Sequence, residues 1–325
     1  MRISFVLPGA TTALFLLLVL AGCAAPPAPA EKKAEAPAAP PPAIQAELLG
    51  SDKSWGNTEG PAVDSKGTLY FTSRGTFKGI VSWTAEKGFQ QYLAVAKGAG
   101  PGGLWIDAED NIFVTATDER QILKVTPLKK VSVVAGKFEA DAKLAKGPND
   151  LVVAKDGTIY FTDPNGYDGS APNGTVYVIP RGGKASVFSA EITGPNGIGL
   201  SDDEKTLYVS HNISADTSKV VRWALNSDGT HGPIAEMATV KPCVADGIAV
   251  DKEGAMWLTC YSHGTAYRLN SEGKVLATIT TEQKALTNVK FGRAGAETAL
   301  YFTSSDMERV TGYVYRAKVA VPGLR

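Results

Sequence analysis

The sequence has no surplus of either charge. Its 325 residues include 33 Lys and Arg against 33 Asp and Glu. Nucleic-acid-binding proteins need clustered positive charge and solvating tails need runs of acid, so this balance argues against both classes. No stretch keeps a sustained helical period of apolar residues. Short apolar runs bounded by Gly, Asp and Asn recur instead, which favours an all-β protein, and the length is ample for a large buried core.

A long apolar run near the N-terminus is also missing. The run at residues 13–21 is too short for a comfortable membrane span; it follows Arg2 and ends in Leu20-Ala21-Gly22-Cys23. This segment resembles a bacterial lipobox, in which the cysteine is lipidated and becomes the new N-terminus. The alternative is an ordinary signal peptide that happens to contain a cysteine.

The segment after the cysteine has the composition of a tether. Residues 24–43 are rich in Pro and Ala and have no apolar face to bury, which is typical of an extended, semi-rigid linker. We therefore predict a signal peptide over residues 1–22, a tether over 23–43 and a folded domain over 44–325. The predicted location is the cell envelope, with a lipid on Cys23 as the membrane anchor. Ala24 after the cysteine favours the periplasmic side of the outer membrane.

Cysteine is scarce, with three residues in the chain. Apart from Cys23, only Cys243 and Cys260 remain. They lie on segments expected to pair as antiparallel strands, so they could form a disulfide in an oxidising compartment. The alternative is two buried thiols.

One pattern recurs six times along the chain: a turn, a short apolar strand, an acidic or Gly-containing turn, and a second apolar strand. The repeats begin at Thr58, Gly100, Gly147, Gly194, Val244 and Leu286. The central aromatic residues of their second strands are spaced by 43 to 49 residues. About four short strands per unit at this period predict a six-bladed β-propeller. The sixth unit lacks a fourth strand, and we expect residues 43–49 to supply it and close the ring.

Polar residues recur at the start of the first strand of each repeat. These positions, called the ring positions below, are Glu59, Gly102, Asn149, Asn196, Asp246 and Asn288. The first strand of each blade lies nearest the axis, so equivalent positions should surround it. Buried amides and carboxylates are costly without a partner. Calcium takes such oxygen ligands, whereas the turn propensity of Asn, Asp and Gly is the alternative explanation for any single position.

The repeats carry motifs of a known superfamily. They read "EGP" from Glu59, "PND" from Pro148, "PNG" from Pro195 and "DGIAVD" from Asp246. The chain resembles the gluconolactonase, regucalcin and luciferin-regenerating-enzyme superfamily, whose members are six-bladed propellers with one catalytic divalent metal.

The resemblance implies a particular set of metal ligands. Glu59, Asn196 and Asp246 would be the main ones, and Asn149 would complete the coordination or hold the substrate. Calcium fits this donor set best; Mg²⁺, Mn²⁺ and Zn²⁺ stay open, although zinc prefers the Cys and His side chains that these positions lack. Animal members carry an arginine where this chain has Gly147, which leaves the identity of the substrate open.

The resemblance also implies a function, the metal-dependent hydrolysis of a lactone. The metal would polarise the carbonyl, and a carboxylate would take a proton from water. Asp246 is the first candidate for this base and Glu59 the second. The ends of the second strands should return to the same face and line the substrate cleft; the residues there are Arg74, Thr117, Asp163, His211, Tyr261 and Ser304.

Some of these cleft residues have alternative readings. Asp163 is also a natural turn cap before Pro164, and His211 is also a natural packing residue. The insertion that contains Tyr167 is either a lid or an ordinary loop. We predict Asn149, Asp163, His211 and Arg74 as substrate-binding residues.

Two other functions remain open at this stage. A propeller is a platform, so the domain could be an envelope ligand-binding protein with calcium in a structural role. It could also hydrolyse phosphoesters with the same metal. The expected partners are a small molecule and a membrane; nucleic acid is not expected, and the sequence indicates no protein partner.

Overall fold

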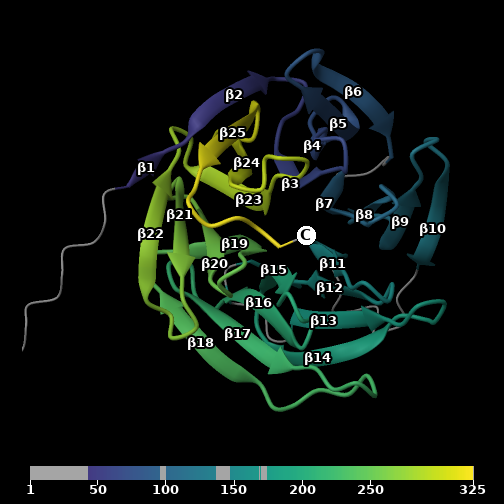
Figure 1. Ribbon diagram of the computed structural model, residues 1–325, viewed down its shortest axis with the longest axis vertical. Coiled ribbons are helices and arrows are strands. Elements are labelled where there is room, and N and C mark those ends of the chain that lie inside the picture. Colours follow the sequence, from purple (N-terminus) through teal and green to yellow (C-terminus); the bar gives the residue numbers. More distant parts are fainter. Residues whose placement is uncertain (1–42, 96–99, 137–146, 168, 170–173, 325) are drawn as a thin grey trace, which may run out of the picture. The chain divides into compact units, whose positions relative to one another are not determined.

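The computed structural model describes residues 43–95, 100–136, 147–167, 169 and 174–324 (Figure 1). The predicted signal peptide, the predicted lipidation site Cys23 and nearly all of the predicted tether lie outside the described residues. Within the described ranges, no helix has the length and hydropathy that a membrane crossing needs.

The described strands form six small sheets that follow one another around a ring (Figure 1). The first sheet holds β3 (Thr58–Val63), β4 (Leu69–Arg74), β5 (Lys78–Thr84) and β6 (Gly88–Ala94). The second holds β7 (Pro101–Ile106), β8 (Ile112–Ala116), β9 (Gln121–Val125) and β10 (Val131–Gly136). The third holds β11 (Leu151–Val153), β12 (Ile159–Asp163), β13 (Gly174–Ile179) and β14 (Ser186–Ile192).

The other three sheets continue the same meander. The fourth holds β15 (Pro195–Leu200), β16 (Thr206–Asn212), β17 (Ser218–Ala224) and β18 (Ala235–Val240). The fifth holds β19 (Val244–Val250), β20 (Met256–Tyr261), β21 (Thr265–Leu269) and β22 (Val275–Thr280). The sixth holds β23 (Ala285–Phe291), β24 (Ala299–Ser305) and β25 (Gly312–Lys318). The predicted six-bladed β-propeller is confirmed.

An N-terminal strand closes the ring, as predicted, with a small shift in position. Strand β2 (Glu47–Asp52) pairs antiparallel with β25 and is the fourth strand of the sixth blade. Strand β1 (Ile44–Gln45) instead pairs parallel with β22 of the fifth blade. The N-terminal segment therefore covers the outer edges of two blades, which leaves fewer backbone groups unpaired than one added strand would.

Apolar side chains pack between neighbouring sheets all the way around the ring. The described buried apolar residues form six clusters, each shared by two successive blades. Trp257 of the fifth blade and Phe302 of the sixth, for example, belong to one cluster, and both are fully buried. Each such side chain contributes about 1.5–3 kcal/mol of burial free energy. This packing fixes how each blade sits against the next.

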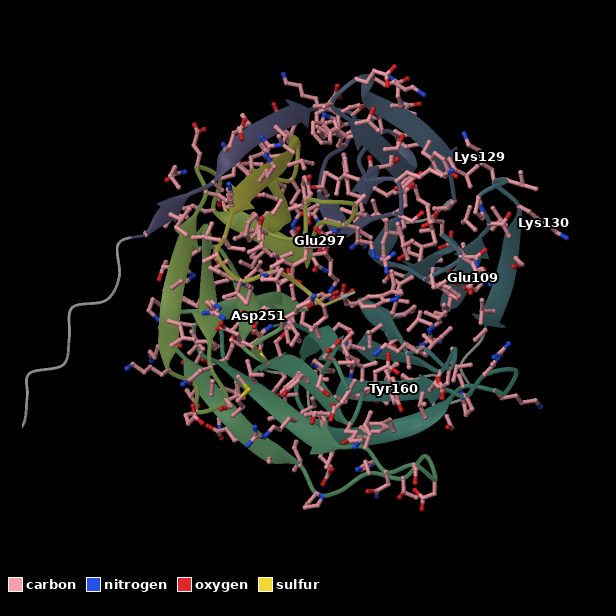
Figure 2. The ribbon with its side chains drawn as sticks, in the orientation of Figure 1. Glu109, Lys129, Lys130, Tyr160, Asp251 and Glu297 are labelled. Carbon is pink, nitrogen blue, oxygen red and sulfur yellow. A yellow bond between two sulfur atoms is a disulfide. The ribbon has the colours of Figure 1, made fainter. Side chains whose placement is uncertain are left out.

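Charged side chains lie both at the outer edge of the ring and in its interior. Figure 2 shows Lys129 and Lys130 at the outer edge of the second blade, while Asp251 lies closer to the middle. Asp251 is fully buried, and it accepts a hydrogen bond from Arg268 Nε at 2.8 Å. The inner strands themselves are buried along their whole length in most blades, as β3 and β15 are. The ring positions at their starts are thus held in a rigid frame.

Candidate functional site

The ring positions occupy a repeated irregularity in the inner strands. The pairing register shifts between Glu59 and Ala62 in β3, and between Pro195 and Ile198 in β15. Equivalent shifts occur in β7, β19 and β23. A bulge sets two residues against one on the partner strand and re-aims a side chain, and bulges are common beside active sites. The repeated bulge accounts for polar side chains that turn toward the axis within otherwise apolar strands.

A glycine follows the ring residue in several repeats because the neighbouring inner strand is too close for a side chain. A Cβ added to Gly197 would meet the backbone of Asp246 and Ile248. A Cβ added to Gly103 would meet Asp150 in the same way. The glycine of the "PNG" motif therefore lets adjacent inner strands approach closely enough for the ring side chains to converge.

In the first five blades, a hydroxyl on the second strand holds the inner-strand backbone of the next blade. The donors and acceptors are Thr72 to Gly102 O, Thr115 to Asn149 O, Thr162 to Asn196 O, Ser210 to Asp246 O and Thr259 to Thr287 O, over 2.6–2.9 Å. Thr287 in turn donates to Thr58 O at 2.8 Å. These bonds, called the hydroxyl latches below, fix the ring carbonyls and so position the side chains beside them.

A cavity of about 530 Å³ opens where the ring side chains meet. Its described lining consists of Asn57, Glu59, Arg74, Asn149, Tyr167, Asn196, Ala215, Val244, Asp246, Tyr261, Ser262 and Arg309. All four predicted metal ligands are in this list, together with Arg74 and Tyr261 from the predicted cleft. The structure thus brings together residues that are far apart in the sequence. Its volume lies in the range of about 300–1,000 Å³ that is usual for small-molecule sites.

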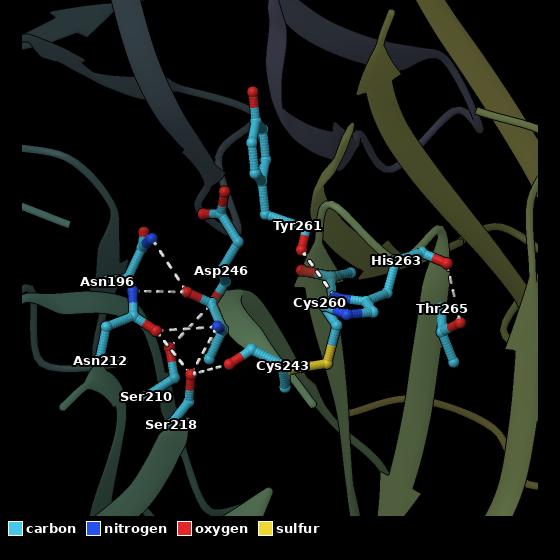
Figure 3. Close-up of a disulfide and its surroundings, with 12 residues drawn as sticks. Asn196, Ser210, Asn212, Ser218, Cys243, Asp246, Cys260, Tyr261, His263 and Thr265 are labelled. Atoms are coloured by element: carbon cyan, nitrogen blue, oxygen red, sulfur yellow. Dashed lines mark hydrogen bonds between the residues drawn. A yellow bond between two sulfur atoms is a disulfide. The ribbon is translucent and has the colours of Figure 1, made fainter. Parts of the chain in front are cut away.

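The two amides are oriented by their neighbours. Asn196 donates from Nδ2 to Ala245 O at 3.2 Å, which leaves its Oδ1 for the cavity side. Asn149 donates from Nδ2 to that Oδ1. Asn212, fully buried in β16, accepts from Ala245 N at 2.8 Å and donates to Ala245 O at 3.2 Å. Figure 3 shows this clamp next to Asp246, whose backbone is thereby fixed from both sides.

The carboxylates of the cavity raise one another's pKa. Burial raises the pKa of Glu59 from 4.5 to about 7; the charge of Asp150 adds to this rise and the charge of Arg74 opposes it. Burial, followed by the charges of Glu59 and Asp150, raises the pKa of Asp246 well above its usual range. Glu59 is 5% exposed and Asp246 is 7% exposed. Two nearly buried acids that share one cavity favour a bound cation or a proton.

Asp150 and Lys290 form a buried ion pair near these acids. Lys290 Nζ lies 3.9 Å from Asp150 Oδ2 and donates to Ile248 O at 2.8 Å. Asn288 Nδ2 also donates to Asp150 Oδ2, at 3.2 Å. Lys290 lines a second, smaller cavity of about 90 Å³ between the inner strands, where Arg293 also lies. Lys290 is therefore the cation that faces Asp150, whereas Arg74 and Arg309 are the cations that act on Glu59 and Asp246.

The donor set fits a hard cation. Glu59 and Asp246 offer carboxylate oxygens, and Asn149 and Asn196 offer amide oxygens, which are the ligand types that calcium takes. No described residue donates a hydrogen bond to the Asp246 carboxylate, so a buried acceptor is left for a ligand. Among the described side chains, no three or more His, Cys, Asp or Glu gather as a metal cluster. The fit thus depends on two acids and two amides together.

The two cysteines form a disulfide beside this site. Cys243 and Cys260 are joined with a Cα–Cα distance of 5.0 Å, and both are fully buried. Figure 3 shows the link between the strand that carries Asp246 and the strand that carries Tyr261. The sequence left a disulfide and two buried thiols both open, and the structure has the disulfide.

Other predicted cleft residues lie elsewhere. Asp163 is 1% exposed and accepts from Gly147 N at 3.1 Å, so it ties the start of the third repeat to β12, as a capping residue does. His211 is 6% exposed, its Nδ1 lies 3.2 Å from Thr193 O, and burial lowers its pKa. Neither is among the described residues that line the cavity. The hydrogen bonds given above tie both to the backbone, and their role in substrate binding stays a prediction.

Other predicted cleft and ring residues also form hydrogen bonds with the backbone. Thr117 donates to Pro148 O at 2.9 Å, and Ser304 donates to Ala285 O at 3.0 Å. At the sixth ring position, Asn288 Oδ1 accepts from the neighbouring Val289 N at 2.8 Å. A local backbone donor therefore competes for the amide oxygen that a ring of ligands would have used.

The cavity also contains residues that sequence reasoning did not select. Arg309 comes from the turn between β24 and β25, in a segment with no motif, and Tyr167 comes from the insertion that the sequence left as either a lid or a loop. The residues of the hydroxyl latches could have been found from the sequence, because Thr or Ser recurs at one position of the second strands. Asp150 was visible in "PND" but gave no indication of its pairing with Lys290.

Comparisons with known proteins agree with the family resemblance and with the fold. The sequence profile of the SMP-30/Gluconolactonase/LRE-like region matches residues 57–306. A gluconolactonase from Zymomonas mobilis is 27% identical over 81% of this chain and 80% of its own length.

Two solved structures share the fold. A gluconolactonase from Xanthomonas campestris superimposes with a TM-score of 0.68 at 24% identity, covering 85% of this chain and 88% of its own. Regucalcin from Agrobacterium tumefaciens, described as a calcium-binding protein, gives a TM-score of 0.71 at 18% identity, covering 86% and 96%.

Proposed function

The chain belongs to the SMP-30/Gluconolactonase/LRE-like family, and we propose that it is a hydrolase that opens a lactone ring with water and uses a divalent cation held between its inner strands. One observation carries this proposal. Two nearly buried carboxylates, Glu59 and Asp246, meet two oriented amides, Asn149 and Asn196, in one cavity of small-molecule size. The gluconolactonase relative from Zymomonas mobilis supports the lactone as the substrate class.

The burial of the two acids supports a divalent cation. Glu59 and Asp246 are nearly buried, whereas the two arginines that share their cavity are more exposed to solvent. Buried carboxylates without a close partner are costly, so a dication between them would stabilise the arrangement. All the cavity donors are oxygens, which favours calcium, and the regucalcin relative is described as calcium-binding. Magnesium or manganese would suit the same donors, whereas zinc prefers nitrogen and sulfur.

The chemistry then divides between the cation and the protein. The bound cation would polarise the lactone carbonyl and stabilise the negative charge that develops on its oxygen. Water adds to the carbonyl carbon, the ring C–O bond breaks, and the ring oxygen leaves with a proton as a hydroxyl, so the product is a hydroxy acid. A group of the protein must accept the proton of the attacking water and return one to the leaving oxygen.

Asp246 is our candidate for this proton acceptor. Glu59 and Asp246 are the carboxylates in the described lining of the cavity. Gly60 N donates to Glu59 Oε2 at 3.3 Å, whereas no described donor occupies the Asp246 oxygens. Asn149 and Arg74 line the same cavity and would orient the substrate's hydroxyl and carbonyl oxygens.

The test combines metal content with activity. Bound divalent metal is measured by elemental analysis in the wild type, in Asp246→Ala and in the control Asp202→Ala, whose side chain lies on an exposed turn. We expect about one ion per chain in wild type and control, little in Asp246→Ala, and lactone hydrolysis that is lost on chelation. A metal-bound wild type inert toward lactones and phosphoesters would favour a ligand-binding propeller. Full activity without metal would overturn the proposal.

We further propose that the protein works in the cell envelope, anchored by a lipid on Cys23. The "LAGC" sequence and the Pro/Ala-rich segment after it support this location. The Cys243–Cys260 disulfide supports it independently, because such bonds persist in oxidising compartments. Membrane fractionation of cells that express wild type or Cys23→Ala tests the proposal. Wild type in the membrane and the variant in the soluble fraction are expected; the same fraction for both would refute the anchor.

A further inference from the structure

The cavity has opposite charges at its two levels. Glu59 and Asp246 are nearly buried, whereas Arg309 is exposed to solvent and Arg74 is partly exposed, although all four line the same space. The acids thus lie deep in the cavity and the arginines nearer its mouth. A neutral lactone needs the deep groups for its carbonyl but offers no negative charge to the Arg309 guanidinium at the mouth. A charged group on another part of the substrate would suit that guanidinium.

Arg309 is held in place rather than free to move. Its Nε donates to the Tyr261 hydroxyl at 3.0 Å, and its guanidinium carbon lies 5.6 Å from the centre of the Tyr261 ring. Tyr261 follows Cys260, whose disulfide fixes that end of β20. Figure 3 shows the Tyr261 ring extending past the Asp246 carboxylate, away from the disulfide. A guanidinium fixed in this way loses little entropy when a ligand binds.

The fixed guanidinium keeps donors for a ligand. Tyr261 engages Nε, and the described residues offer no hydrogen-bond acceptor to the two terminal nitrogens of Arg309. Those nitrogens form the planar fork that matches a carboxylate, sulfonate or phosphate. Arg74 adds a second positive charge to the same cavity. The mouth therefore has the chemistry of an anion-binding subsite.

The proposed cation decides how an anionic substrate would lie. It would bind at Glu59 and Asp246 and take the lactone carbonyl, so the reacting group occupies the deep end of the cavity. A negatively charged substituent is attracted toward Arg309. A lactone with a charged substituent would thus bind with its carbonyl deep and its substituent at the mouth. The cavity of about 530 Å³ has room for a sugar-sized ring with such a group.

We infer that the substrate is a hydroxylated lactone that carries a negatively charged substituent, and that Arg309, supported by Tyr261 and joined by Arg74, is the residue that selects it. The inference rests on the proposed lactone hydrolysis for its reaction and on the geometry of Arg309 for its selectivity. Arg309 is a specificity residue, because it would touch the substituent rather than the carbonyl that reacts.

Paired substrates test the selectivity. The rates on 6-phosphoglucono-1,5-lactone and on a lactone with a free carboxylate are compared with the rate on neutral glucono-1,5-lactone. We expect kcat/KM to favour the anionic lactones at least 10-fold in wild type. Arg309→Gln should lower kcat/KM for both anionic lactones roughly 10- to 100-fold, as expected for loss of a charge-assisted hydrogen bond, and change the neutral lactone less than about 3-fold.

Three controls separate selectivity from stability and from net charge. Arg293→Gln removes the same charge from the smaller cavity and should leave the preference unchanged. Arg309→Lys should keep part of the preference, since it retains the charge but not the fork. Tyr261→Phe should weaken the preference because it frees the Arg309 side chain. An equal loss on neutral and anionic lactones in Arg309→Gln would overturn the inference.

A binding measurement distinguishes the two proposals. Calorimetry compares 6-phosphogluconate with gluconate, which are ring-opened products and need no catalysis to bind. Tighter binding of the phosphorylated acid that depends on Arg309, in a protein that opens no lactone, would keep the anion subsite and reject the lactonase. Lactonase activity without any preference for anionic compounds would keep the lactonase and reject the subsite.

Discussion

The disulfide between Cys243 and Cys260 allows a prediction whose size can be calculated. The link joins residues separated by 17 positions and closes a loop that the unfolded chain cannot open. Loop-closure entropy for a loop of this length amounts to about 3 kcal/mol at 25 °C. Removing the link should therefore lower the free energy of unfolding by about 3 kcal/mol. Alanine is the substitution of choice, because both cysteines are fully buried and serine would bury a hydroxyl.

The single variants make the prediction sharper. Cys243→Ala and Cys260→Ala each break the same bond, so each alone should cost nearly as much as the double variant. Two independent packing defects would add instead. Urea unfolding followed by tryptophan fluorescence measures all three proteins against the wild type. With a slope of about 3 kcal/mol per molar urea, the midpoint should fall by roughly 1 M.

Reductant gives an internal control. Wild type unfolded and refolded with excess dithiothreitol should approach the midpoint of the double variant, because the unfolded chain exposes the bond. The double variant should not respond to dithiothreitol. Wild type and variants with the same midpoint under oxidising conditions would refute the reasoning, and so would single costs that sum to the double cost.

The site is expected to survive this change. The Asn212 clamp on Ala245 and the Ser210 latch on Asp246 hold that segment without help from the disulfide. Metal content should therefore stay near the wild-type value in the double variant at low urea. Loss of the metal together with the disulfide would mean that the covalent link, rather than the hydrogen bonds, positions Asp246.

Three further predictions concern the frame around the site. Lys290→Met should lower the free energy of unfolding by about 3 kcal/mol, because it leaves the buried Asp150 carboxylate without its cation. Adding Asp150→Asn should restore most of this stability. Urea titration of the single and double variants tests the prediction, and an unchanged single variant would contradict it. Gly197→Ala should cost about 1–3 kcal/mol and reduce metal binding, because its Cβ meets the backbone of the next inner strand. Gly199→Ala on the same strand should cost less, since its Cβ meets only side-chain methyl groups, of Val250 at 3.3 Å and of Ile248 at 3.6 Å. Thermal melts with metal analysis compare the two variants, and equal effects would count against close strand approach. For His211, burial lowers the pKa of the folded state below its ordinary 6.5, so the unfolded state takes up the proton first. The stability of the wild type should therefore fall as pH drops below about 6.5. His211→Gln should lose less stability between about pH 7.5 and 5.5, and identical pH slopes would rule out this histidine as the cause.

The repeat alone determined the architecture. The period and the strand alternation predict where four residues that are distant in the sequence meet. These residues occupy equivalent positions in their repeats; they are Glu59, Asn149, Asn196 and Asp246. The reason is that blades with the same strand order set equivalent residues at equivalent distances from the axis, whatever the detailed packing. The same argument placed Cys243 near Cys260, but it left open whether the two cysteines are joined, which the structure decided.

The sequence left the contacts of individual side chains undecided. Asn288 has the same residue type as Asn196, yet a neighbouring backbone N–H takes its amide oxygen. Asp163 and His211 stand at the right ends of their strands, yet each is tied to the backbone of its own blade. Such outcomes depend on which donor lies nearest after folding, and spacing in the sequence does not contain that information.

Tertiary structure alone revealed the charges that complete the site. Lys290 neutralises Asp150 from another blade, and Arg309 reaches the cavity mouth from a turn with no motif. The N-terminal strand also shifted from its expected range, because β1 and β2 cover the edges of two blades rather than one. The sequence by itself thus determined where the ring lies and what it is made of, since both follow from local period. Which charges surround it was decided only by packing between blades, where residues without any shared pattern come within a few ångströms of one another.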